Sequence, residues 1–452
     1  MSREARRRPV VLYQPRDEGA CMPLGLLSLG SRLAAADAHV VIVDGRFELA
    51  PEARVVQLAE RASCLGVTVR TGTPLHDALR ISAAARAANP RLHVLWGGPH
   101  ATWAPESCLA TGMVDGCVRG AGEEPLAAAV AAIHCGRSLE PVPGLVLPGG
   151  VVPRPVPAPA PAEVPPAVYS LLDVERHFEA RGARQLDYCS SRGVRDAGWS
   201  GLTAERVLAE LGELAERHRL SEVVFQDEDF FADPARAAAI AEGLLAASPA
   251  LGWQAGACVL DVLEGGHDHL ALLARTGCRR LHLRVPPGVP AAGGLRDQVL
   301  DAAALLRAAG LPARFDLCLD ERGPRLDGLK AVVSLARRLC ALDPRFETPL
   351  RRPTGRLPAA HSTDAAGTLE GWAAREQEPW PDLRAERLLT RASFFFREAQ
   401  RTPGRRLGQH LLHLLSLVRV RVGFFALDLE RRAVEASALL RTGRPRPQPR
   451  LD

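Results

Sequence analysis

The feature that most constrains this fold is an alternation, over the first 136 residues, of short apolar runs with longer runs of helical period. Runs such as "PVVLYQP" (9–15), "HVVIVDG" (39–45) and "LHVLWGG" (92–98) are each followed by a segment whose apolar residues recur every three or four positions. Strands this apolar are buried on both faces, which is typical of a parallel sheet covered by helices. We therefore predict an α/β fold that opens with a Rossmann-like parallel sheet of about five βα repeats, with ligands bound beyond the carboxyl ends of its strands.

Three further parts are expected after this first domain (1–136). Residues 137–168 are rich in proline, which favours extended backbone and predicts a semi-rigid linker with room for one small hairpin. Residues 169–350 repeat the βα alternation about six times, which predicts a (β/α)6-type partial TIM barrel. Residues 351–452 are expected to form a helical carboxyl-terminal extension packed on the barrel or on a partner. The expected barrel strands are 184–190, 222–226, 252–257, 279–285, 313–318 and 343–347.

Composition excludes several classes of protein. The chain has 452 residues, of which 47% are hydrophobic, and a formal net charge of +5, which is too weak to argue for nucleic acid or an anionic membrane. Its ten cysteines are scattered rather than arranged as a disulfide framework. We see neither a signal peptide nor 18 uninterrupted apolar residues, so we expect a cytoplasmic protein with no membrane span.

Three glycine-bearing loops are expected at one edge of the first sheet: "VTVRTG" (67–72), "GGPHAT" (97–102) and "RGAGEE" (119–124). Glycine permits close backbone approach, and helix amino termini present free N–H groups to a ligand. The alternative is that these glycines only end strands, and the lack of GxGxxG after the first strand argues against a dinucleotide site. The candidate ligand-binding residues are Thr68, Thr71, Gly97, Gly98, His100, Arg119, Gly120 and Gly122.

These loops, with "PLGLLSLGSRLAAADAHVVIVDGR" (23–46) before them, resemble the cobalamin-binding domain at the front of cobalamin-dependent radical S-adenosylmethionine (SAM) enzymes. The agreement covers most of residues 9–134. Some corrinoid proteins place a DxHxxG histidine on cobalt after the first strand, but "QPRDEGACMPLG" (14–25) has no histidine. The resemblance therefore implies cobalamin bound without a protein histidine on its lower face.

The second half carries the other part of the resemblance in "YCSSRGVRDAGWSG" (188–201). Active relatives of this family have CxxxCxxC here, whose three thiolates hold a four-iron four-sulfur cluster with one iron open to SAM. This chain has Val194, Gly198 and Gly201 at those positions. Because valine and glycine offer no soft anionic ligand, a cluster is not expected, and Cys189 is interpreted as a buried strand cysteine. The loop should follow the first barrel strand, with Gly193 and Gly198 keeping it flexible and Trp199 filling the vacated space.

Other family landmarks are also altered. Asp227, Glu228 and Asp229 could face the barrel mouth, or they could cap the following helix. Pro286 stands at a position where relatives carry a glutamate. The pairs His267/His269 and His410/His413 are interpreted as a solvated helix start and an amphipathic helix rather than metal sites. No catalytic residue and no metal ligand is assigned.

The first hypothesis is a cobalamin-binding, radical-SAM-like protein that has lost its cluster and acts as a non-catalytic or accessory partner of an intact paralogue or pathway enzyme. One alternative is a cobalamin-dependent methyltransferase that works without a cluster, with SAM or another methyl donor. Another is a structural subunit of an intact paralogue, whose cobalamin pocket is empty.

Overall fold

The computed structural model describes residues 8–17, 21–70, 73–247, 250–285, 293–318, 335, 338–339 and 343–347. The chain divides into two compact units. The described residues of the first unit lie within 8–256 and 271–279, and those of the second within 257–270 and 280–347. The expected helical extension (351–452) lies outside the described residues, and so do Thr71, Pro286, His410 and His413.

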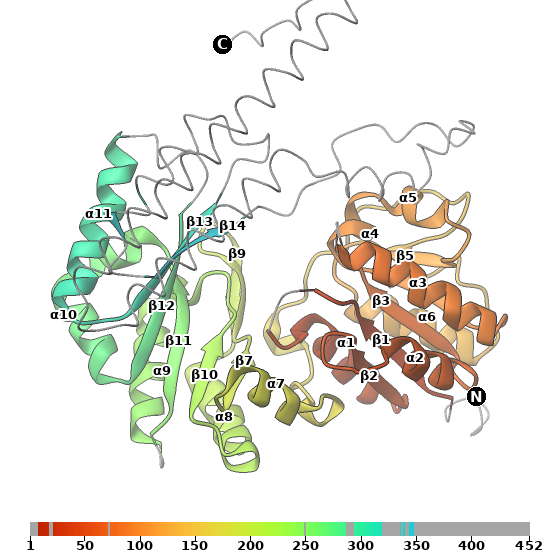
Figure 1. Ribbon diagram of the computed structural model, residues 1–452, viewed down its shortest axis with the longest axis horizontal. Coiled ribbons are helices and arrows are strands. Elements are labelled where there is room, and N and C mark those ends of the chain that lie inside the picture. The colour runs from red at the N-terminus through yellow and green to blue at the C-terminus, as the bar shows by residue number, and fades with distance from the viewer. Residues whose placement is uncertain are drawn as a thin grey trace, which may run out of the picture. The chain divides into compact units, whose positions relative to one another are not determined.

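The amino-terminal domain is the expected Rossmann-like parallel sheet. Its strand order is β2-β1-β3-β4-β5-β6, with parallel pairing from β2 through β5 (Figure 1). The strands are β1 (Val10–Gln14), β2 (Val40–Asp44), β3 (Cys64–Thr68), β4 (His93–Gly97), β5 (Gly116–Val118) and β6 (Leu145–Val146). The helices are α1 (Leu24–Ala34), α2 (Pro51–Ala59), α3 (Thr73–Ala88), α4 (Pro99–Trp103), α5 (Pro105–Leu109) and α6 (Glu123–His134).

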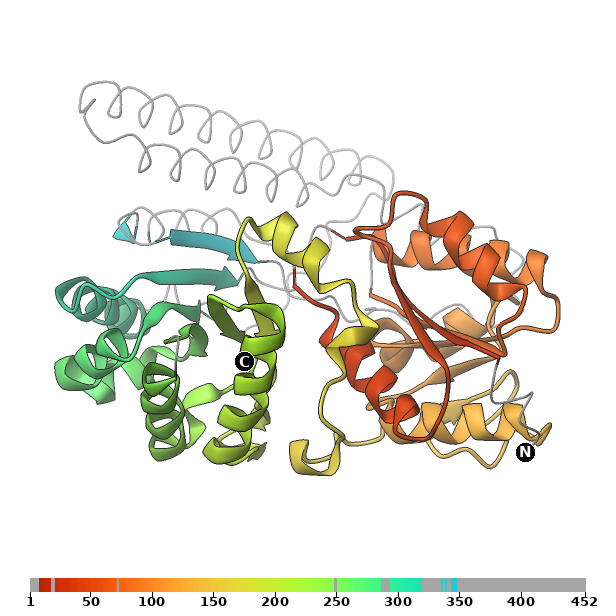
Figure 2. The same ribbon diagram turned by 90° about the horizontal axis from the view of Figure 1, so that it is seen from below.

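Each face of this sheet has its own apolar core, because successive side chains on a strand point to opposite faces. Val10 and Leu12 belong to one cluster with residues of α1 and α6, whereas Val11 and Tyr13 belong to the other with residues of α2 and α3. Helices therefore cover both faces, as Figure 2 shows. All five residues of β1 are buried, in agreement with the apolar run Val10–Tyr13, and the strand ends at the buried polar residue Gln14.

The proline-rich segment is partly built into the first sheet. Strand β6 comes from this segment and pairs antiparallel with β5. Val156 forms a further bridge with Gly120. Two short 3-10 turns follow, η2 (Pro161–Glu163) and η3 (Tyr169–Leu171). Proline removes amide donors locally, but the residues between the prolines still complete the sheet.

The second βα series contains all six expected strands. In the first unit, β7 (Gln185–Tyr188), β10 (Glu222–Phe225) and β11 (Gly252–Ala257) pair in parallel. In the second, β12 (Cys278–Val285), β13 (Ala313–Cys318) and β14 (Asp343–Glu347) do so. The helices of the series are α7 (Val174–Arg181), α8 (Ala204–His218), α9 (Pro234–Ala246), α10 (Val259–Arg275) and α11 (Gly293–Ala308), and η4 (Phe230–Ala232) is a short 3-10 turn.

A β-hairpin stands where a flexible loop was expected after β7. Strands β8 (Ser191–Val194) and β9 (Ala197–Gly201) pair antiparallel. Gly193 and Gly198 adopt φ values of 78° and 73°, a left-handed conformation that residues with a side chain rarely take. The glycines therefore shape a defined turn rather than a flexible loop.

None of the described helices combines the length with the apolar character that a membrane span requires. His267 and His269 lie on α10 next to a kink at Gly266, and the described residues contain no group of three or more His, Cys, Asp or Glu side chains arranged to hold a metal ion.

Candidate functional site

An apolar cavity of about 280 Å³, here called the slot, opens into the first sheet. Leu12, Gly66 and Leu95 contribute its floor from β1, β3 and β4, and helices α1 and α6 contribute its leucine-rich side. A Cβ atom at Gly66 would lie 2.8 Å from Leu12 Cδ2, so the strand packs this closely only because residue 66 has no side chain. The slot therefore suits an apolar group.

Five of the predicted ligand-binding residues meet at this slot: Thr68, Gly97, Gly98, Gly120 and Gly122. Gly98 and Gly120 have φ values of 87° and 93°. A Cβ at Gly98 would also lie 2.8 Å from Thr68 Oγ1. The backbone path and neighbouring protein atoms therefore require glycine at both positions, and ligand binding by these residues stays a prediction.

Two predicted residues do not line the slot. His100 is 1% exposed and lies on α4 inside the domain. Arg119 uses its guanidinium to hold loop backbone, since Nε donates to Thr102 O at 3.0 Å and Nη1 donates to Pro153 O. Arg119 thus ties the proline-rich segment to the sheet, a structural contact that the local sequence does not reveal.

A larger cavity of about 510 Å³, here called the mouth cavity, adjoins the slot within the first unit. The two cavities share Gly25, Leu26, Thr68 and Arg192 as lining residues. One wall of the mouth cavity comes from loops of the first sheet, another from Val164–Ala167, and a third from β7, α8 and the residues after them. Sequence reasoning missed this cavity, because residues far apart in the chain build its walls.

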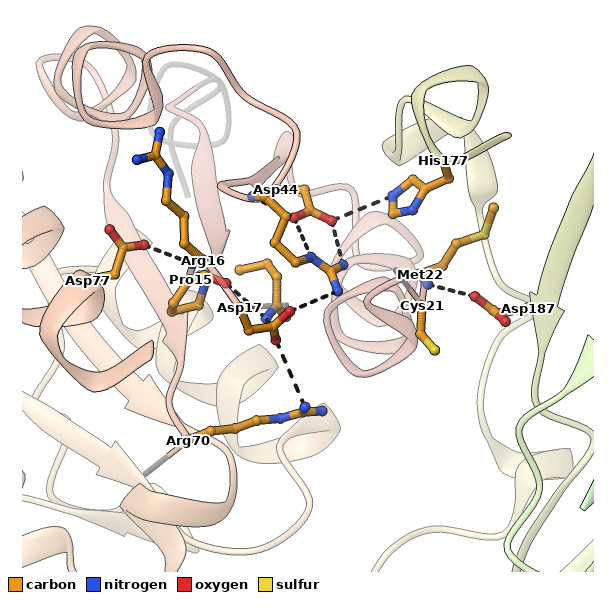
Figure 3. A network of polar contacts seen from close by, with 12 residues as sticks. Pro15, Arg16, Asp17, Cys21, Met22, Asp44, Arg70, Asp77, His177 and Asp187 are labelled. Atoms are coloured by element: carbon orange, nitrogen blue, oxygen red, sulfur yellow. Dashed lines mark hydrogen bonds and ion pairs between the residues drawn. The ribbon is translucent and has the colours of Figure 1, made fainter. Parts of the chain in front are cut away.

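Charged side chains surround the mouth cavity on the side of the first sheet (Figure 3). Asp17 lies 3.5 Å from Arg46 and 4.0 Å from Arg70, and Arg46 also pairs with Asp44 at 2.7 Å. The Arg70 side chain is 55% exposed, so it remains accessible to a ligand. The Arg70 guanidinium is therefore a cation at a partly enclosed cavity, where its attraction to an anionic ligand group is stronger than in bulk water.

A buried carboxylate joins the first domain to the second βα series. Asp187, on β7, is fully buried and accepts a hydrogen bond from Met22 N at 2.6 Å (Figure 3). Gln226 Nε2 donates to the same side chain at 2.7 Å, and Arg181 pairs with it. Asp187 thus fixes the loop before α1, which forms part of the cavity wall.

A further acidic side chain, Glu210, lines the mouth cavity. Glu210 accepts hydrogen bonds from Tyr188 Oη at 2.6 Å and from Arg206 Nε at 2.9 Å. Burial and the Glu210 carboxylate raise the pKa of Tyr188 above its usual value, so its hydroxyl stays protonated and donates. Together, Tyr188, Arg206 and Glu210 form a hydrogen-bonded part of the wall of the mouth cavity.

The three residues at which the sequence predicts no cluster ligand, Val194, Gly198 and Gly201, lie in the β8–β9 hairpin. Val194 is 40% exposed, and the other two positions remain glycines, Gly198 and Gly201. A Cβ at residue 201 would lie 2.9 Å from the Trp199 ring. Trp199 is half-buried, and its Nε1 donates to Asp229 O at 3.0 Å. Trp199 thus fills space inside the hairpin rather than pointing into solvent.

The hairpin is closed by contacts to the segment after β10. Arg195 makes a two-point ion pair with Asp229, at 3.0 Å from Nε and 2.9 Å from Nη2. The Arg236 guanidinium stacks over Trp199 at 5.6 Å from the ring centroid. Arg236 Nη2 also donates to Ser190 O at 3.0 Å. These contacts hold the hairpin in one conformation.

The acidic cluster after β10 is structural, and neither expected role applies to all of it. Asp227 is 6% exposed and accepts hydrogen bonds from Ser190 N at 2.6 Å and Ser191 N at 3.1 Å. Burial raises its pKa. Glu228 is exposed. The capping residue of α9 is Asp233, which accepts from Arg236 N at 3.0 Å.

The interpretation of Cys189 as a buried strand cysteine is wrong. The residue follows the end of β7, is exposed and lines the mouth cavity. Its thiol donates to Ser191 O at 3.2 Å. The error arises because the sequence predicts a strand from 184 to 190, whereas β7 ends at Tyr188, so Cys189 lies just after the strand.

Comparison with known proteins agrees with this architecture. Residues 17–130 match the family model of the B12 binding domain. The chain is 25% identical over 342 residues to the uncharacterized methyltransferase PH0819 of Pyrococcus horikoshii, covering 70% of this chain and 73% of that protein.

Solved structures share the fold. The radical SAM methyltransferase TsrM from Kitasatospora setae, with cobalamin and a [4Fe-4S] cluster bound, is similar at a TM-score of 0.59 and 18% identity, over 76% of this chain and 72% of TsrM. The cobalamin-dependent SAM radical enzyme OxsB, with aqua-cobalamin and SAM bound, is similar at a TM-score of 0.61 and 20% identity, over 76% of this chain. The chain spans 54% of the length of OxsB. The protein thus has a B12-binding domain and the fold of cobalamin-dependent radical SAM enzymes.

Proposed function

We propose that this protein binds cobalamin in the slot and the mouth cavity, carries no four-iron four-sulfur cluster, and acts as a non-catalytic or accessory partner of an intact radical SAM paralogue or pathway enzyme. The observation that carries the proposal is that residues 17–130 match the B12 binding domain family, while a hairpin with Val194, Gly198 and Gly201 stands where relatives are expected to hold the cluster. The match supports cobalamin binding, and the hairpin offers no thiolate at those three positions.

The residues present fit cobalamin. The slot is apolar, and Gly97, Gly98 and Gly122 would admit the cofactor close to the backbone at the sheet edge. The mouth cavity, which carries charged side chains among apolar ones, adjoins it, so Thr68 and Arg70 would face the cofactor's amide side chains or phosphate. Among the described residues, no histidine lines either cavity, and binding without a protein histidine on cobalt is part of the proposal. When bound, cobalamin supplies a metal centre that accepts and releases a methyl group.

The residues present do not fit the cluster. Val194, Gly198 and Gly201 have no sulfur, and iron in such clusters is held by cysteine thiolates. The exposed thiols of Cys21 and Cys189 line the mouth cavity, but they are two, whereas three are needed. No step that requires a cluster is therefore proposed, and cleavage of SAM to a radical is not part of the function.

The test is reconstitution of the purified protein with hydroxocobalamin, iron and sulfide under anaerobic conditions, followed by desalting and metal analysis. We expect about one cobalt per chain with the corrin absorbance retained, and iron near background. Iron and sulfide at about four each per chain would contradict the cluster-free proposal. Loss of cobalt and corrin absorbance on desalting would contradict cobalamin binding and would favour a structural subunit with an empty pocket.

A second function, a cobalamin-dependent methyltransferase that works without a cluster, is favoured by the similarity to a protein named as a methyltransferase. In this case the mouth cavity would hold SAM or another methyl donor. The measurement is incubation of the reduced, cobalamin-loaded protein with SAM that carries a deuterated methyl group, followed by mass analysis of the extracted cofactor. Label on the cofactor, faster than with free cobalamin, would support this function, whereas equal rates would exclude SAM as its methyl donor.

A further inference from the structure

Arg192 occupies an unusual place among the residues of the slot. It lies on β8, whereas the other lining residues belong to the first domain or, like Ala158, to the proline-rich segment. Arg192 also lines the mouth cavity. Within the described chain it is therefore the one side chain that connects the slot directly with the hairpin at the cluster positions.

The contacts of Arg192 leave most of its hydrogen-bonding capacity unused. Nη2 donates to Glu123 Oε1 at 2.7 Å and to Ser28 Oγ at 3.3 Å. In the part of the chain that the structure describes, Nε and Nη1 make no hydrogen bond, and the side chain is 28% exposed. A guanidinium has five N–H donors, so several remain available where the two cavities meet.

Glu123 holds the guanidinium in this place. It is the first residue of α6 and lines the slot, and its side chain is 8% exposed. Burial alone would raise its pKa, but the Arg192 cation lowers it below the usual value, so the carboxylate stays charged. The pair links the α6 side of the slot to β8, and through the Arg192–Ser200 register to β9.

We propose that Arg192 is a cofactor-binding residue contributed by the radical-SAM-like half, which donates hydrogen bonds to an oxygen of cobalamin at the junction of the slot and the mouth cavity. Because its other contacts are to Glu123 and the hairpin, it also couples occupancy of the slot to the hairpin. This inference rests on the proposed cobalamin binding. Oxygen acceptors are present both on the amide side chains of the corrin ring and on the phosphate of the nucleotide tail.

The first experiment measures the Kd for hydroxocobalamin by equilibrium dialysis in the full chain. We expect Arg192→Met to weaken binding roughly 10- to 100-fold, which corresponds to the loss of hydrogen bonds to a charged donor. Arg192→Lys keeps a cation beside Glu123 but removes donors, and it should lie between Met and wild type. If Arg192→Met proves poorly folded, the lysine variant still tests the inference.

The matched control is Arg195→Met. Arg195 lies in the same hairpin, carries the same side chain, and is 34% exposed, but it pairs with Asp229 and lines neither cavity. Its loss should change the Kd by less than about twofold. Equal weakening by Arg195→Met and Arg192→Met would show that hairpin stability, not a direct contact, sets the affinity, and would overturn the inference.

A second ligand identifies the acceptor. Cobinamide has the corrin amides but lacks the nucleotide tail and its phosphate. If Arg192 contacts a corrin amide, Arg192→Met weakens binding of both ligands. If it contacts the phosphate, the variant weakens binding of cobalamin and leaves cobinamide unchanged. Unchanged binding of both ligands would refute the contact.

Hydrogen exchange reports the coupling without any activity. Cobalamin should slow amide exchange in residues 191–201 of the wild type, and this protection should be lost in Arg192→Met and reduced in Glu123→Gln. A wild type that retains no cobalamin would refute the proposed function itself. A wild type that binds cobalamin, with variants that bind and protect equally well, would refute only the role of Arg192.

Discussion

Gly25 provides the sharpest test of where the ligand binds. It lies in the first turn of α1, is exposed, and lines both the slot and the mouth cavity. A Cβ placed on it meets nothing within 4 Å. A side chain here would therefore occupy cavity space without disturbing the folded protein. Gly98 is less suitable for this purpose, because its φ of 87° strains any side chain before a ligand is considered.

Gly25→Phe should weaken cobalamin binding while the protein stays folded. A phenyl group in a cavity of about 280 Å³ overpacks the bound state. Overpacking costs about 1–3 kcal/mol, which corresponds to a Kd roughly 5- to 150-fold higher. Gly25→Ala should raise the stability of the protein but lower its affinity for cobalamin. Replacing a helical glycine adds roughly 0.5–1 kcal/mol to the free energy of unfolding, whereas the added methyl group lowers affinity slightly.

The assay is equilibrium dialysis with hydroxocobalamin, together with urea unfolding of the ligand-free protein. The matched control is Gly212→Phe, because Gly212 is an exposed glycine of α8 with no atom within 4 Å of its Cβ position, and it lines neither cavity. A folded Gly25→Phe protein with the wild-type Kd would show that neither cavity is the cobalamin site.

Three further predictions concern the hairpin, its buried arginine and pH. The triple variant Val194→Cys, Gly198→Cys and Gly201→Cys should fail to assemble a cluster on reconstitution. Residue 198 has a φ of 73°, and a Cβ at residue 201 would lie 2.9 Å from the Trp199 ring. Iron and sulfide near four per chain would contradict this prediction. Arg236→Met should lower the free energy of unfolding by roughly 2–5 kcal/mol, because the buried carbonyl oxygens of Ser190 and Leu202 lose the guanidinium as their donor. Urea unfolding measures this loss, and Arg195→Met is the comparison variant, for which we expect a smaller effect. Burial lowers the pKa of His177, against the attraction of Asp44, so the unfolded chain binds more protons and stability should fall as pH drops below about 6.5. The same pH series on His177→Phe should lose part of this slope, and an unchanged slope would assign it to other groups.

Local pattern was sufficient for the strands and helices. The apolar runs at Val10–Gln14 and Val40–Asp44 became parallel neighbours, and the six expected strands of the second series all formed. These elements depend on hydrophobic period and on propensity, which are properties of consecutive residues. The cluster-free reading of Val194, Gly198 and Gly201 has the same basis, since the absence of sulfur is visible in the sequence and stays a prediction until iron is measured.

Contacts between distant residues decided the rest. The hairpin was expected to be a flexible loop, because "RGVRDAGWSG" is rich in glycine and short polar residues, yet Asp229 and Arg236, more than 25 residues later in the chain, hold it closed. His100 and Arg119 belonged to the expected loops but turned toward the domain core and the proline-rich segment.

The most informative contact for function joins Glu123 and Arg192, 69 residues apart, at the wall shared by two cavities. Each residue stands in a recognisable motif, "RGAGEE" and "YCSSRG", and neither motif indicates the other. Whether their charges meet depends on how β8 is placed against α6. That placement follows from tertiary packing, because a period of two or of 3.6 residues specifies which side chains share a face but not which face of another element they reach.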